Sequence, residues 1–176
     1  MKLTIAVVLL LCVAGTAQAE DPPDRWQPVR FMLGSWQGEA TGEPGKGTVE
    51  RTYELVLGGK FMEEHNTSTY AATAPDRKPE IHHHRGFISF DKARSTLMLR
   101  HFHEEGFVNL YALNATASTK THLVFDSVSF ENFSNQWKAR ETYDVVSADE
   151  FIETFELAEP GKEFAVYSRN HFRRKS

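Results

Sequence analysis

From residue 48 onward, apolar and polar side chains alternate in short runs, and most runs end at a glycine, a proline or a polar cluster. Alternation with a period of two is typical of a β-strand with one buried face. In residues 48–55, for example, Val49, Tyr53 and Leu55 fall on one face, and threonines and glutamates fall on the other. The predicted strands are a first run through residues 36–40 and the runs 48–55, 60–70, 82–91, 96–103, 107–113, 122–130, 137–145, 151–157 and 163–173.

These runs predict an all-β fold of about ten strands with almost no helix. Short connections between consecutive runs favour an antiparallel up-and-down arrangement, and closure into a barrel would remove the exposed edges of an open sheet. An open sandwich is the alternative. Ahead of the strands, residues 24–33 are predicted to form a short helical turn that points Trp26, Phe31 and Leu33 inward.

The N-terminus has the pattern of a secretory signal peptide. Lys2 precedes an apolar run over residues 3–15, and Ala17-Gln18-Ala19 forms an A-x-A cleavage site. Cleavage would leave residues 20–176 as a single domain, secreted or periplasmic, with no membrane span; an uncleaved anchor is the alternative. Cys12 is the only cysteine, so the mature domain is predicted to have no disulfide, thiol nucleophile or cysteine metal site.

The charge pattern argues against a nucleic-acid partner. The formal net charge is −4, and the basic residues are scattered except at residues 173–175. Asn66, Asn114 and Asn132 begin N-x-S/T sequons, which would matter only in a eukaryotic secretory pathway. The sequence leaves open the choice between that pathway and a bacterial periplasm, and it also leaves open the oligomeric state.

Three segments resemble the nitrobindin-like, haem-binding β-barrels of the calycin superfamily, which also includes lipocalins and fatty-acid-binding proteins. Residues 33–42 resemble the L-G-x-W-x-G-x-G opening of that family, with Ala40 in place of a glycine. Residues 82–87 are similar to its H-x-E-x-G-F/Y segment, with His84 in place of the glutamate. Residues 140–143 resemble its R-R-E-Y region.

The resemblance implies a calycin-like barrel around a cavity that holds a small apolar or amphipathic ligand, with haem as the first candidate. The family ligates ferric haem through a histidine of the last strand, and that position falls on Tyr167 in this sequence. His171 follows four residues later, so an uninterrupted strand would point both side chains to the same face. Tyr167 or His171 is therefore the implied axial ligand, with His82, His84 or His101 on the other side. Such barrels isomerise peroxynitrite to nitrate on ferric haem.

Several polar residues share strand faces with aromatic residues. Arg51 lies with Tyr53, Glu141 with Tyr143, and Asn109 with Tyr111. A charge that faces a barrel interior costs several kcal/mol unless it is paired. Two interpretations follow: Arg51 and Glu141 pair with each other, or Arg51 anchors an anionic head group in a haem-free carrier of lipid-like anions. The predicted ligand-binding residues are Trp36, Arg51, Tyr53, Asn109, Tyr111, Glu141 and Tyr143.

Two histidine pairs, His82 with His84 and His101 with His103, raise the alternative of a zinc or copper site. Such a site would need a third ligand, for which His65 or Glu63 is the candidate. The preferred interpretation is that these histidines lie at the barrel rim and strand ends, so no metal site is predicted.

Other charged residues are given structural roles. The adjacent carboxylates at residues 63–64 and 104–105 are interpreted as solvated charges rather than a glycosidase pair. No G-x-S-x-G elbow indicates a serine hydrolase. Arg169 or Arg173 is expected to pack over Trp36, as a late arginine does in lipocalin-like barrels.

Overall fold

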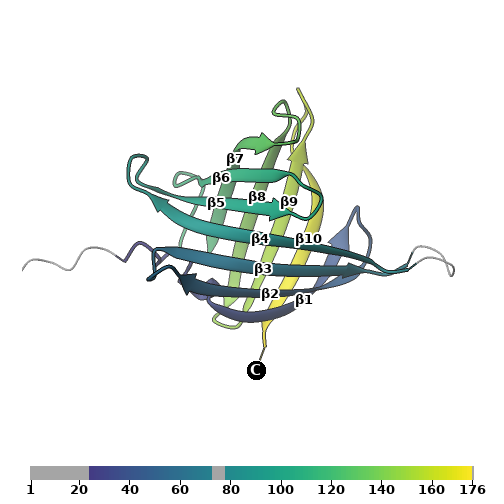
Figure 1. Cartoon of the computed structure of the whole chain (residues 1–176), viewed down its shortest axis with the longest axis horizontal. Coiled ribbons are helices and arrows are strands. Elements are labelled where there is room, and N and C mark those ends of the chain that lie inside the picture. Colours follow the sequence, from purple (N-terminus) through teal and green to yellow (C-terminus); the bar gives the residue numbers. More distant parts are fainter. Residues whose placement is uncertain (1–23, 73–77, 176) are drawn as a thin grey trace, which may run out of the picture.

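Ten strands form one closed antiparallel barrel in the computed structural model, which describes residues 24–72 and 78–175 (Figure 1). The strands are β1 (Gly34–Gly42), β2 (Gly47–Val56), β3 (Phe61–Tyr70), β4 (Glu80–Asp91), β5 (Thr96–His103), β6 (Val108–Leu113), β7 (His122–Glu131), β8 (Lys138–Ser147), β9 (Glu150–Ala158) and β10 (Ala165–Arg174). Each strand pairs with its neighbours in the sequence, and β1 pairs with β10. The predicted up-and-down barrel is confirmed, and the open sandwich is excluded.

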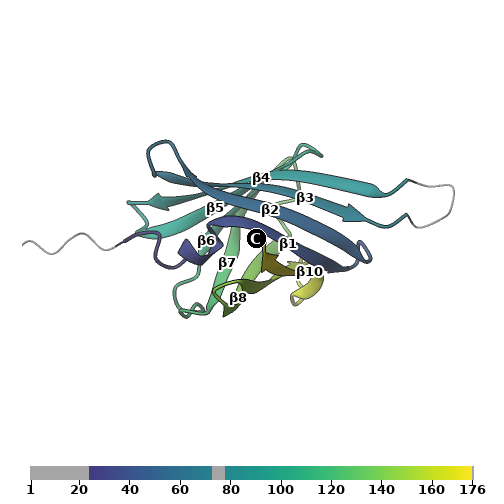
Figure 2. The same ribbon diagram turned by 90° about the horizontal axis from the view of Figure 1, so that it is seen from below.

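The strands curve around one interior, with β2, β3 and β4 along one wall and β7, β8 and β10 along the facing wall (Figure 2). The alternation of the sequence decides which side chains point inward. In β3, every second residue from Met62 to Tyr70 is buried, and the residues between them are partly exposed.

The predicted signal peptide, residues 1–19, lies outside the described residues. The described ranges contain no helix that is both long enough and apolar enough to cross a membrane.

One end of the barrel is closed by the segment that leads into β1, which includes the short 3-10 helix η1 (Arg30–Met32). Backbone hydrogen bonds join residues three apart in this segment, so Trp26, Val29 and Met32 come to the same side and are buried. Trp26 takes its predicted inward position. Phe31 and Leu33, which were also expected to point inward, are only partly buried and pack against the core.

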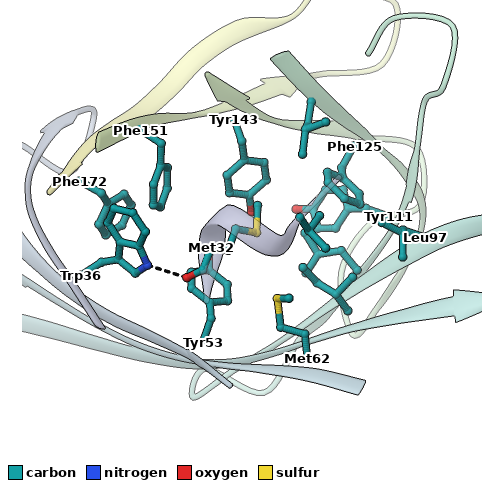
Figure 3. Packing of buried hydrophobic residues seen from close by; sticks show 14 of the residues in the cluster. Met32, Trp36, Tyr53, Met62, Leu97, Tyr111, Phe125, Tyr143, Phe151 and Phe172 are labelled. Atoms are coloured by element: carbon teal, nitrogen blue, oxygen red, sulfur yellow. Dashed lines mark hydrogen bonds between the residues drawn. The ribbon is translucent and has the colours of Figure 1, made fainter. Parts of the chain in front are cut away.

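Trp36 of β1 connects this segment to the barrel. Its Nε1 donates a hydrogen bond to the carbonyl oxygen of Met32 at 2.6 Å (Figure 3). Arg174 covers the indole, with its guanidinium carbon 4.2 Å from the ring centroid. The prediction of Arg169 or Arg173 over Trp36 is wrong, because these two residues are on the outward face of β10.

The interior is apolar in the half next to η1 and polar in the other half. Aromatic rings such as Tyr143 and Phe151 fill the apolar half (Figure 3). The change occurs within single strands: in β10 the inward residues run from Phe172 to Asn170, and in β3 they run from Met62 to the carboxylate at position 64. The polar half is therefore built by the same strands that hold the core.

Candidate functional site

The polar half contains a cavity of about 430 Å³, within the size range of small-molecule sites. Its mouth, at the end opposite η1, has aromatic and apolar side chains on one part of its rim, Pro44, Tyr70, Phe107, Phe155 and Tyr167, and the polar side chains of Glu80, His82 and Glu105 on another. Its floor has charged and amide side chains that are all buried: Arg51, Asn66, His101, Asn109, Glu141, Glu153 and Asn170. The cavity thus offers an entrance that is aromatic in part and a hydrogen-bonding base.

Arg51 of β2 lies at the centre of the floor. Its Nη1 and Nη2 donate to the two carboxylate oxygens of Glu153 at 2.5 and 3.0 Å, and its Nε donates to Asn66 Oδ1 at 2.9 Å. Glu64 Oε1 lies 3.2 Å from the same Nε. The predicted pairing of Arg51 with Glu141 is therefore wrong. The charge of the guanidinium is compensated by these buried carboxylates.

Glu64 of β3 is fully buried beneath the floor, between Arg51 and two histidines. Its Oε1 lies 2.7 Å from His84 Nε2, and its Oε2 lies 3.4 Å from His101 Nε2. Burial disfavours the charged carboxylate, but Arg51 and His101 outweigh this effect and hold the pKa of Glu64 well below its usual range. Glu64 is therefore a carboxylate, although it has no contact with solvent.

His101 of β5 connects Glu64 to a second buried carboxylate. Its Nδ1 lies 3.0 Å from Glu141 Oε1, and Tyr143 donates its hydroxyl proton to Glu141 Oε2 at 2.7 Å. Burial opposes the imidazolium, but Glu141 and Glu64 together raise the pKa of His101 to about 10. The imidazole is consequently protonated at neutral pH.

His84 and His103 are neutral imidazoles on the same wall. Burial lowers the pKa of His84, and burial together with His101 and His84 lowers the pKa of His103 to about 3. Both line the cavity, and the His103 ring stacks on Phe107 with centroids 4.2 Å apart. A neutral imidazole is the form that ligates metals.

Gly86 of β4 makes room for the contact between Glu64 and His101. A Cβ atom at this position would lie 2.9 Å from Glu64 Cβ and 2.9 Å from His101 Cδ2. Any side chain at position 86 would therefore push the carboxylate and the imidazole apart.

Asn170 of β10 presents an unpaired acceptor to the cavity. Its Nδ2 donates to Glu153 Oε2 at 2.7 Å, which fixes the orientation of the amide. Within residues 24–72 and 78–175, its Oδ1 is the buried side-chain atom that has no hydrogen-bond partner. Such an orphaned acceptor is costly unless a ligand or a water molecule donates to it.

A β-bulge in β10 separates the two predicted axial ligands. The pairing of β10 with β9 shifts register between Val166 and Ser168, so Tyr167 lies at the bulge and lines the mouth. His171 lies on the outer face of the barrel, where its Nε2 is 2.5 Å from Glu150 Oε1. The prediction that Tyr167 and His171 share a face is wrong, because the bulge adds one residue to the alternation.

Seven of the predicted site residues line the cavity, namely Arg51, His82, His84, His101, Asn109, Glu141 and Tyr167. Of the others, Trp36, Tyr53, Tyr111 and Tyr143 belong to the core beneath the floor. The hydroxyl groups of Tyr53, Tyr111 and Tyr143 nevertheless contact Arg51, Asn109 and Glu141, respectively. These three tyrosines therefore support the floor from below.

Glu64 and Glu153, the two carboxylates that hold Arg51, were not predicted as site residues, and the interpretation of Glu64 as a solvated charge is wrong because its side chain is buried. Glu63 and Glu64 are the same residue type, so composition does not distinguish them. Glu64 lies two residues after the apolar Met62, however, and alternate residues of a strand face the same side, so this spacing would have marked Glu64 as inward. The expected third metal ligands, Glu63 and His65, lie on the outer face, 3.1 Å from each other. Glu64 is the carboxylate near the inward histidines.

The three sequons lie in different environments. Asn66 is buried in the floor, where it bonds Arg51 and Ser68, so the folded interior has no room for a glycan there. Asn114 is partly buried and donates to Asp126, and Asn132 is exposed.

Comparisons with known proteins agree with the barrel. The family model described as "THAP4-like, heme-binding beta-barrel domain" matches residues 25–174. A search of curated proteins finds no match. The crystal structure of Rv2717c from M. tuberculosis is similar, with a TM-score of 0.62 at 16% identity, covering 89% of this chain and 100% of that chain. At this identity the likeness shows the fold alone.

Two further solved structures have lower scores. EF1p2_mFAP2b bound to DFHBI has a TM-score of 0.40 at 12% identity, covering 86% of this chain and 100% of that chain. A protein of unknown function from Nostoc punctiforme PCC 73102 has a TM-score of 0.28 at 9% identity, covering 86% of this chain and 99% of that chain.

Proposed function

We propose that this protein, which belongs to the THAP4-like, haem-binding β-barrel family, binds a small amphipathic ligand in the cavity at the open end of its barrel. The observation that carries the proposal is the placement of aromatic side chains at the mouth of the cavity, above a buried polar floor. The mouth suits the apolar body of a ligand, and Asn170 Oδ1 on the floor accepts a hydrogen bond from its polar end.

Haem is the first candidate ligand because the family is described as haem-binding. The side chains at the mouth of the cavity fit haem better than those of the floor. Tyr167 offers a phenolate, an established haem ligand type, and lies edge-on to Phe155 with ring centroids 5.7 Å apart. Neutral His84 and His103 line the cavity as further donors. The charged floor does not suit an apolar macrocycle. When bound, haem would supply an iron centre with a strong visible absorption.

A titration with hemin tests this assignment. The purified protein is expected to develop a Soret band, and Tyr167→Phe is expected to lose it because the phenolate oxygen is removed. His171→Ala is the matched control and should bind like the unaltered protein, since His171 lies outside the barrel. A band that persists in Tyr167→Phe would remove Tyr167 as the ligand, and no band at all would remove haem. The peroxynitrite isomerisation that the family resemblance implies depends on the same result.

The polar floor favours a second candidate function, the binding of a ligand other than haem that carries a hydrogen-bond donor. Asn170 Oδ1 requires such a donor, whereas the floor offers few apolar contacts. Native mass spectrometry of protein purified from its own source would distinguish the two candidates by the mass of the bound species.

Export is part of the proposal and rests on the signal-peptide pattern of residues 1–19. Mass spectrometry of the protein recovered outside the cytoplasm should find Glu20 as its first residue. A retained N-terminus, or recovery only from the cytoplasm, would contradict export.

A further inference from the structure

We propose that Glu64, His84 and His101 form a binding site for a divalent transition-metal ion, of which Zn²⁺ is representative, at the floor of the cavity. This site goes beyond the binding of a ligand at the mouth: it includes His84 and His101, which also line the cavity, but it does not include Tyr167. It rests on the convergence of the donor atoms, on the support around them, and on the charge of the interior.

The donor atoms already converge. One nitrogen of each histidine and one carboxylate oxygen all lie within 4.8 Å of one another. Ligand atoms of a tetrahedral zinc ion, at about 2.0–2.1 Å from the metal, are separated by roughly 3.4 Å. Small rotations of these side chains would therefore complete the geometry. Two histidines and one glutamate are a known ligand set for zinc sites that keep an open position.

The groups around the donors have the arrangement of a metal site. Metal-bound histidines usually donate their second ring nitrogen to a carboxylate, which fixes the ring. His101 does this with Glu141, and Tyr143 in turn orients Glu141. The absence of a side chain at Gly86 allows Glu64 and His101 to approach each other. These contacts hold the donors in place.

The charge of the interior also favours a cation. Among the described residues, the buried carboxylates are Glu64, Glu141 and Glu153, and Arg51 is the buried cation that carries a permanent charge. The interior therefore holds an excess of about two negative charges when the histidines are neutral. A divalent ion bound by neutral His84 and His101 would balance that excess.

The first test is calorimetric titration of the metal-stripped protein with ZnCl₂. We expect one ion per chain. His84→Ala should weaken binding by more than about 100-fold because it removes one of the three ligands. The fold should tolerate this change because His84 is partly exposed. Glu141→Gln should weaken binding by about 10-fold, because it removes only the orientation of His101. His65→Ala is the control, since His65 belongs to the outer cluster with Glu54 and Glu63.

Each outcome decides the proposal. Binding that is lost in His65→Ala but kept in His84→Ala would assign the metal to the outer surface and overturn it, as would the absence of any stoichiometric binding. A crystal of the unaltered protein soaked with Zn²⁺ provides a test without mutation. The anomalous peak should lie between Glu64, His84 and His101, and a peak elsewhere would contradict the site. Tyr167→Phe should leave Zn²⁺ affinity unchanged even if it abolishes hemin binding, so the two assignments fail independently.

Discussion

At the scale of single residues, the side chain of Arg51 shows how the polar floor is maintained. A buried ion pair is often no more stabilising than apolar residues of similar size, but removal of one partner leaves an unpaired buried charge. Arg51 is 3% exposed and bonds Glu153 through two oxygens. The Arg51–Glu153 pair therefore fixes a polar surface inside the barrel, and loss of either partner would lower the stability of the fold considerably.

Glu153→Gln is predicted to destabilise the fold by about 3–5 kcal/mol, because Arg51 would keep its charge without its bidentate partner. Glu39→Gln is the control, since Glu39 is an exposed carboxylate on the outer face of β1. The free energy of unfolding from urea titration measures both. A loss in Glu153→Gln no larger than that in Glu39→Gln would show that Arg51 does not depend on its bidentate contact with Glu153.

At the scale of elements, the strands could be predicted from the sequence because alternation is a local property. Residues 48–55, for example, match β2 to within one residue at each end. The partners across the barrel could not be predicted in this way. Arg51 meets Glu153, 102 residues away, only because the closed barrel brings β2 and β9 together across the interior.

The bulge in β10 also could not be predicted from the local sequence pattern. It depends on how β10 pairs with β9, and the sequence between Val166 and Ser168 carries no glycine that would have marked it. A one-residue shift exchanges the inward and outward faces of a strand, so it decided the placement of Tyr167 and His171. The candidate site was therefore predicted in its residue types and only in part in its geometry.

Arg174→Ala is predicted to destabilise the fold by about 1–3 kcal/mol. Arg174 covers the Trp36 ring and donates to the carbonyl of Leu33, so its loss removes a cation–π contact and leaves a backbone acceptor unpaired. Arg173→Ala should change stability by less than about 1 kcal/mol, since Arg173 makes a surface ion pair with Glu150. Equal thermal shifts in the two variants would contradict the assignment of Arg174 to the closed end.

At the scale of the whole molecule, the barrel gathers its buried acidic and basic side chains in one half of its interior. His101 faces Glu64 from β3, Glu141 from β8 and His84 from β4, with Arg51 beyond Glu64. The free energy of unfolding should therefore depend on pH through this half.

The metal-free protein, kept in EDTA, is predicted to be most stable near pH 6.5. The pKa of His101 rises to about 10 on folding, so its contribution is complete below the unfolded value of about 6.5 and is lost as the pH rises to about 10. The pKa of His103 falls to about 3, so the unfolded chain binds the extra proton and stability also decreases below about pH 6.5.

Thermal melting between pH 4 and pH 10 measures this dependence. A melting temperature that rises steadily from pH 6.5 to pH 10 would contradict the assignment of a protonated His101.

The position of Asn66 has a practical consequence for producing this protein. The sequon is accessible on the newly synthesised chain but lies inside the barrel once β3 has paired with β2 and β4. In a eukaryotic expression host, a sugar attached during translocation would have to occupy the space where Asn66 bonds Arg51, so the modified chains could not close. The yield of native protein from such a host would therefore be set by competition between glycosylation and folding. A bacterial host would avoid that competition.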